Sequence, residues 1–219
     1  MSSTRFLSGM ALSLGIVFGA FASDQDFPVD PGLLVLRATS HGTKIKFRAR
    51  KGSVSFPGGE SPTISGAAFQ LYNTSGGTDD LCVSLPASNW KVAAKNPNYG
   101  PVAWRYHDPG NTLGPVQSAH FGGGGTHADI RVLLKGAAYT LDEASQGSIG
   151  VGLPMSNVLS QPYPDHTRYC TDFVPPYATI TQDVPGAFRA QFNSPNQFSG
   201  PCPTAPTFCS PGGAFLDPE

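Results

Sequence analysis

The sequence predicts an all-β protein: an antiparallel β-sandwich, with an irregular β-barrel as the alternative, long loops and a disulfide-pinned C-terminal arm. First, apolar and polar residues alternate in several short runs, as they do in half-buried strands. Second, the 219 residues include 26 Gly and 21 Pro, which supply the backbone geometry of turns. Third, no window repeats apolar residues at helical spacing.

The N-terminus predicts a secretory signal peptide over residues 1–22. Arg5 supplies the positive charge, Phe6–Phe21 is apolar or small, and Ala20-Phe21-Ala22 fits a small-x-small cleavage site. A membrane helix is the alternative, but the apolar run is too short and lacks a following charge cluster. Cleavage near Ala22 would leave a secreted or periplasmic protein. No later stretch is long and apolar enough to suggest a transmembrane segment.

The remaining chain reads as a short flexible lead at 23–32, a single β-domain at 33–203 and a Pro/Gly-rich tail at 204–219. Within the domain, the alternating runs are separated by turn sequences such as "SFPGGESP", "NTSGGTDD" and "HDPGNTLGP". The expected strands, in chain order, are "TKIKFRAR", "ISGAAFQLYN", "LCVSLP", "VAWRYHD", "ADIRVLLKG" and the runs around Tyr139–Leu141 and Ile149–Leu153. We find no internal repeat in the sequence.

The run "TKIKFRAR" is the strongest candidate for a binding surface. Ile45, Phe47 and Ala49 would face the core, and the basic residues Lys44, Lys46, Arg48 and Arg50 would face the other way. With Arg37 and Lys51 they concentrate positive charge that could bind an anionic surface polysaccharide or lipopolysaccharide. The alternatives are a solvated strand face, or an edge strand charged against aggregation.

Four cysteines, Cys82, Cys170, Cys202 and Cys209, form no C-x-x-C pair. In an exported chain an even number of cysteines favours two disulfides over a zinc site. The sequence permits three pairings. We favour Cys170–Cys202 with Cys82–Cys209, which pins the proline-rich C-terminal segment to the domain.

The segment Asp142–Ser148 concentrates polar groups between two alternating runs, and we interpret it as the loop that joins two strands. A secreted hydrolase with a site assembled from distant residues is the alternative function. Its candidate groups are Asp142, Glu143, His107 and Asp108. Adjacent carboxylates do not by themselves make a catalytic pair, which needs a second acidic group across a cleft.

No cofactor is indicated by the sequence. His120, His127 and Asp129 flank Gly122–Gly125, but their spacing matches no compact metal-binding motif. The glycine run lacks the ending of a phosphate-binding loop, and no G-x-S-x-G is present. The formal net charge of −1 gives no reason to expect nucleic acid as a partner.

Several segments resemble, in order, a family of small exported proteins of myxobacteria and related proteobacteria whose domain has no known function. They are "GAAFQLYN", "LCVSLPASNWK", "WRYHDP", "GPVQSA", "AYTLDEASQGSIGVGL", "RYCTDF" and a late "CP". The resemblance covers roughly residues 33–203. It implies an exported domain with Trp90, Trp104, Tyr106 and Leu141 as framework positions, and it supplies no catalytic residues. From the signal peptide, the β patterning, the paired cysteines and the absence of a catalytic motif, we expect a non-catalytic structural or binding module.

Overall fold

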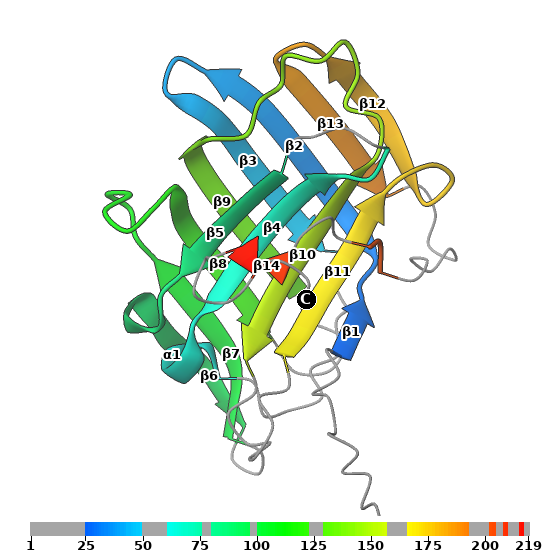
Figure 1. The fold of residues 1–219 in the computed structure, drawn as a ribbon. Helices are drawn as coiled ribbons and strands as arrows, with labels where there is room; N and C mark the ends of the chain where they lie inside the picture. The colour runs from blue at the N-terminus through cyan, green and yellow to red at the C-terminus, as the bar shows by residue number, and fades with distance from the viewer. Residues whose placement is uncertain are drawn as a thin grey trace, which may run out of the picture.

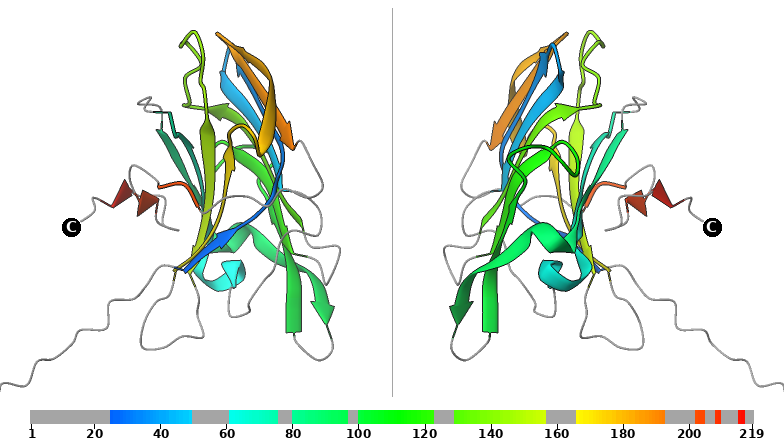
Figure 2. Two further views of the ribbon diagram at one scale, coloured as in Figure 1. Left: turned by 90° about the vertical axis from the view of Figure 1, so that its right-hand side faces the viewer. Right: turned by 90° about the vertical axis from the view of Figure 1, so that its left-hand side faces the viewer.

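A computed structural model describes residues 25–49, 61–75, 80–96, 100–122, 129–156, 166–192, 202–204, 208–209 and 215–216. The chain forms two β-sheets that pack face to face (Figures 1 and 2). The predicted all-β sandwich is confirmed. The barrel does not form, because the larger sheet runs openly from β12 to β6.

The smaller sheet has five strands in the order β1-β11-β10-β4-β5. All neighbours are antiparallel except β1 and β11, which run parallel. The strands are β1 (Gln25–Pro28), β4 (Ala67–Asn73), β5 (Asp80–Leu85), β10 (Ile149–Ser156) and β11 (His166–Phe173).

The larger sheet has eight antiparallel strands in the order β12-β13-β2-β3-β9-β8-β7-β6. The strands are β2 (Pro31–Thr39), β3 (Gly42–Ala49), β6 (Trp90–Asn96), β7 (Gly100–His107), β8 (Val116–Gly122), β9 (Asp129–Ala137), β12 (Ala178–Val184) and β13 (Ala187–Phe192). Two single turns of helix, α1 (Pro62–Ser65) and η1 (Ala87–Asn89), lie in connections at the sheet ends.

Aromatic side chains from both sheets build the core. Phe47 of β3 meets Phe69 and Phe173 of the smaller sheet, with ring centroids 6.3 and 6.2 Å apart. All three side chains are at most 1% exposed, and burying each contributes on the order of 1.5–3 kcal/mol. Trp90 packs on Tyr106 and donates its indole N–H to the Leu85 carbonyl at 3.1 Å. The core thus fixes which face of each strand remains outside.

Two disulfides hold the C-terminal arm on the outer face of the smaller sheet. Cys82 of β5 is bonded to Cys209, and Cys170 of β11 is bonded to Cys202; this is the favoured pairing. The Tyr72 hydroxyl also donates to the Pro203 carbonyl at 3.0 Å. Short strands β14 (Phe208–Cys209) and β15 (Phe215–Leu216) of the arm lie outside this sheet in Figure 2.

The segment 23–32 differs from the expected flexible lead where the structure describes it. Asp26 to Pro28 pair with β11, Val29 is 1% exposed, and Pro31 already opens β2. Arg168 of β11 fixes β1 by donating hydrogen bonds of 2.8 and 2.6 Å from Nε and Nη2 to the Asp26 carboxylate. This partner is distant in sequence, so no local pattern reveals the strand. The proposed signal peptide lies outside the described residues.

Candidate anion-binding site

The alternation in β3 places its basic side chains on the outer face of the larger sheet. Ile45 and Phe47 are at most 1% exposed, while Lys44 and Lys46 are exposed and Arg48 is half-buried. Arg50, the fourth candidate, lies outside the described residues. Strand β3 is central in its sheet, between β2 and β9, so protection of an edge does not explain its charges.

Pairing of β3 with its neighbours extends this charge across the sheet. Arg48 is opposite Arg131 of β9, and Arg131 is opposite His120 of β8. His120 is opposite Arg105 of β7, which is opposite Lys91 of β6. We call these five residues the basic row. Because strands are spaced about 4.8 Å apart, the row extends over about 19 Å.

The basic row belongs to a wider positive face. Among the Lys and Arg residues whose side chains the structure describes, nine point outward from the strands of the larger sheet. They are Arg37, Lys44, Lys46, Arg48, Lys91, Arg105, Arg131, Lys135 and Arg189. Among the described residues of these strands, Asp129 is the single carboxylate on that face. Like charges placed directly opposite one another destabilise a sheet. The basic row therefore lowers the stability of the fold, and stability does not explain why it is present.

Asp129 organises the centre of the row. Its carboxylate accepts hydrogen bonds from Nε (2.7 Å) and Nη2 of Arg131, and its Oδ1 lies 3.3 Å from Nε2 of His120. Burial lowers the pKa of His120 below its usual value, with Arg131 and Arg105 acting in the same direction against the attraction of Asp129. The imidazole of His120 is therefore neutral at pH 7. The guanidinium of Arg131 is held in place by its two hydrogen bonds to Asp129.

The metal-binding interpretation gains nothing from this arrangement. Asp129 is already engaged by Arg131, and His127 lies outside the described residues. The group of potential ligands that the described residues bring together consists of Asp26, Cys170 and Cys202. Its two cysteines are bonded to each other and cannot supply the thiolates that a metal requires.

The segment Asp142–Ser148 is part of the connection from β9 in the larger sheet to β10 in the smaller one. The carboxylate of Asp183, in β12, accepts hydrogen bonds from the Ser145 hydroxyl (2.5 Å) and from the Gln146 (2.6 Å) and Gly147 (3.0 Å) amides. Asp142 is exposed and has no hydrogen bond with a described residue. The Ser145 hydroxyl and the Gln146 and Gly147 amides therefore shape the loop.

The other hydrolase candidates are placed in a different loop. His107 ends β7 on the outer face, and Asp108 begins the β7–β8 connection. Asp108 accepts hydrogen bonds from the Leu113 and Thr112 amides and from the Thr112 hydroxyl, at 2.9, 3.1 and 2.9 Å. The Leu113 amide is the main cause that lowers the pKa of Asp108. Such a carboxylate is ionised at neutral pH and serves as a loop cap rather than a proton donor.

The sequence pattern predicts the basic strand β3 but not the continuation of the basic row on β6, β7, β8 and β9. The signal was present in part, because Arg105 and His107 alternate with apolar residues in "VAWRYHD". What joins these residues to Arg48 is strand order and register, which local patterns do not contain.

No helix among the described residues has the length and apolar character needed to cross a bilayer. Comparison of the chain with protein-family models, curated proteins and solved structures found no match. The fold and the site together define a disulfide-bonded β-sandwich with one strongly basic sheet face.

Proposed function

We propose that this protein is an exported, non-catalytic binding module whose basic sheet face binds an acidic polysaccharide at a bacterial cell surface. The single observation that supports this most is the basic row, five basic side chains in register on five adjacent strands. The predicted signal peptide and the two disulfides support a location outside the cytoplasm.

The chemistry of the row favours carboxylate groups on an extended polymer. Three of its members are arginines. Arg131 already donates to Asp129, whereas the planar guanidinium of Arg48 or Arg105 can match a ligand carboxylate in two parallel hydrogen bonds. The row lies across an open sheet, so it suits a chain carrying repeated charges. The exposed large apolar side chains among the described residues are all aliphatic: Ile64, Val92, Leu113 and Val184. They offer no aromatic platform for a neutral sugar.

The proposal is tested with polygalacturonate as an acidic polymer and dextran as a neutral one. If about four cations each release about 0.7 counterion, affinity for the acidic polymer falls roughly 50-fold between about 50 and 200 mM salt. The double variant Arg48→Thr/Arg105→Thr should lose about 1.4 units of that slope. Equal binding of dextran, or an unchanged slope in the variant, would refute the proposal.

A further inference from the structure

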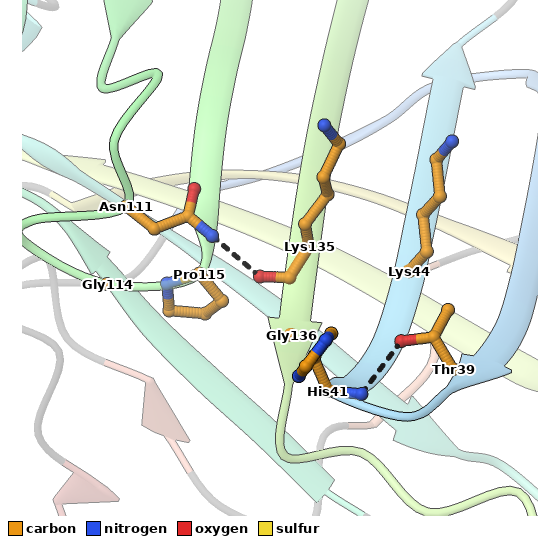
Figure 3. Close-up of a pocket in the computed structure, with 8 residues that line it drawn as sticks. All are labelled: Thr39, His41, Lys44, Asn111, Gly114, Pro115, Lys135 and Gly136. Carbon is orange, nitrogen blue, oxygen red and sulfur yellow. Dashed lines mark hydrogen bonds between the residues drawn. The ribbon is translucent and has the colours of Figure 1, made fainter.

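A hollow of about 520 Å³ opens beside the β2–β3 turn, and Figure 3 shows the residues that line it. Lys44 and Lys135 each lie four positions along their strand from Arg48 and Arg131 of the basic row. Strands β3 and β9 contribute Lys44 and Lys135, and β2 contributes its last residue, Thr39. The β2–β3 turn contributes His41, and the β7–β8 loop contributes Asn111 and Pro115. No carboxylate is among the residues that line it. Neither lysine forms an ion pair with a described acidic residue.

A β-bulge places the two lysines at neighbouring positions on adjacent strands. Thr43 is opposite Ala137 and Ile45 is opposite Leu134, so β9 has one extra residue where Lys44 lies. Gly136 accommodates the bulge with a φ of +73°, a conformation that other residues rarely adopt. A Cβ atom at Gly136 would lie 2.9 Å from the His41 carbonyl oxygen. In Figure 3 both lysine side chains extend in the same direction from neighbouring strands.

The walls of the hollow are fixed before any ligand enters. The Asn111 side-chain amide donates to the Lys135 carbonyl at 3.0 Å, and the Lys135 amide donates to the Pro115 carbonyl at 2.8 Å. The backbone of Lys135 is thus tied to the β7–β8 loop on both sides. These bonds fix the backbone that carries Lys135, whereas the exposed side chains of Lys44 and Lys135 must still be ordered by a ligand.

The charge of the hollow calls for more than one negative charge. Arg37 of β2 is directly opposite Lys44, so a row of three cations crosses β2, β3 and β9. A carboxylate would neutralise one of them, whereas a phosphomonoester carries about −1.5 to −2 at pH 7. Lysine binds phosphate as a point charge, while arginine is favoured for planar carboxylates. The volume leaves room for the group that carries the phosphate.

We infer that the hollow beside Lys44 and Lys135 is a binding site for the phosphomonoester group of a small organic phosphate, for which glucose 6-phosphate is the probe. This site is separate from the basic row and does not require that the row bind a polymer. The two sites differ in chemistry, because the cations that line the hollow are lysines, whereas three of the five residues of the basic row are arginines.

The test follows the backbone amide NMR signals of the isotopically labelled protein during titration with glucose 6-phosphate, inorganic phosphate or galacturonate. The sugar phosphate should shift the signals of His41, Lys44 and Lys135, with a Kd on the order of 1 mM. Lys44→Ser/Lys135→Ser should weaken this binding at least about tenfold. Inorganic phosphate should shift the same signals with lower affinity, because it lacks the sugar.

The matched control is Arg48→Thr/Arg105→Thr, which removes the same number of charges from the basic row. It should bind glucose 6-phosphate as the unmodified protein does. Loss of phosphate binding in this control would place the phosphate on the row and overturn the inference. So would equal affinity for galacturonate, or the absence of shifts at the hollow up to about 50 mM sugar phosphate. Failure of polygalacturonate binding would affect only the proposed function.

Discussion

Replacing Arg105 with threonine separates the role of the basic row in binding from its role in folding. Arg105 is exposed, lies between His120 and Lys91, and is not ion-paired with any described carboxylate. Removing it relieves a like-charge opposition worth about 0.2–1 kcal/mol, and threonine suits an exposed strand position. We expect the free energy of unfolding to stay constant or rise by up to about 1 kcal/mol.

The matched variant is Arg168→Thr, which removes the same charge from the opposite sheet. Arg168 donates two hydrogen bonds to Asp26, and its side chain is 14% exposed against 38% for Asp26. Loss of this partly screened pair should lower the free energy of unfolding by about 1–2 kcal/mol. It should leave affinity for an acidic polymer unchanged, whereas Arg105→Thr should lower that affinity about tenfold, or about 1.4 kcal/mol.

Urea unfolding, followed by the fluorescence of the buried Trp90 and Trp104, measures stability, and titration with polygalacturonate measures binding. We predict that Arg105→Thr lowers affinity for the polymer but not stability, and that Arg168→Thr lowers stability but not affinity. It would be refuted if Arg105→Thr lowered stability by more than about 1 kcal/mol and kept full affinity. The charges would then contribute to the fold rather than to a ligand.

Three further predictions concern particular contacts. Gly150→Ala should destabilise the protein by about 1–3 kcal/mol, because the new Cβ would lie 2.5 Å from the Tyr72 ring. Gly152→Ala is the control and should be nearly neutral, because the nearest atom to its new Cβ is 3.4 Å away. Equal urea midpoints of the two variants would contradict this prediction. Asp183→Ala removes the acceptor of three loop hydrogen bonds and should cost about 1–3 kcal/mol in the same assay; an unchanged midpoint would show that the loop needs no such anchor. Burial lowers the pKa of His120 in the folded chain. The free energy of unfolding should therefore be full above about pH 6.5 and should decrease as the pH falls, while affinity for a polyanion should increase because His120 becomes charged. The variant His120→Gln should reduce both trends, and pH profiles unchanged by this variant would contradict the role given to His120.

The architecture could be predicted because its signals are local. Alternation in β3 identified both the core residues Ile45 and Phe47 and the outward lysines, and the structure agrees. Strand β4 behaves differently, since all seven of its residues are buried. Its outer face is covered by the C-terminal arm, whose contact through Tyr72 and Pro203 joins residues far apart in sequence. A local sequence pattern cannot predict that a distant segment buries the outer face of a strand.

The site could be predicted only in part for the same reason. Lys44, Lys46 and Arg48 share one strand, so their common face follows from a period of two. Arg105 and Arg131 join them through the strand order β3-β9-β8-β7, which brings together segments separated by long stretches of chain. The hollow depends in addition on a bulge at Gly136, and one glycine in a strand does not reveal which side chains it brings together.

The most direct test of the central claim is a map of the polyanion footprint by amide hydrogen exchange, with and without polygalacturonate. We predict that the polymer slows amide exchange along β3, β9, β8 and β7 and leaves exchange on β10 and β11 unchanged. This protection should be lost in Arg48→Thr/Arg105→Thr. Protection confined to the smaller sheet or its arm, or no protection at saturating polymer, would contradict the claim that the basic face is the binding surface.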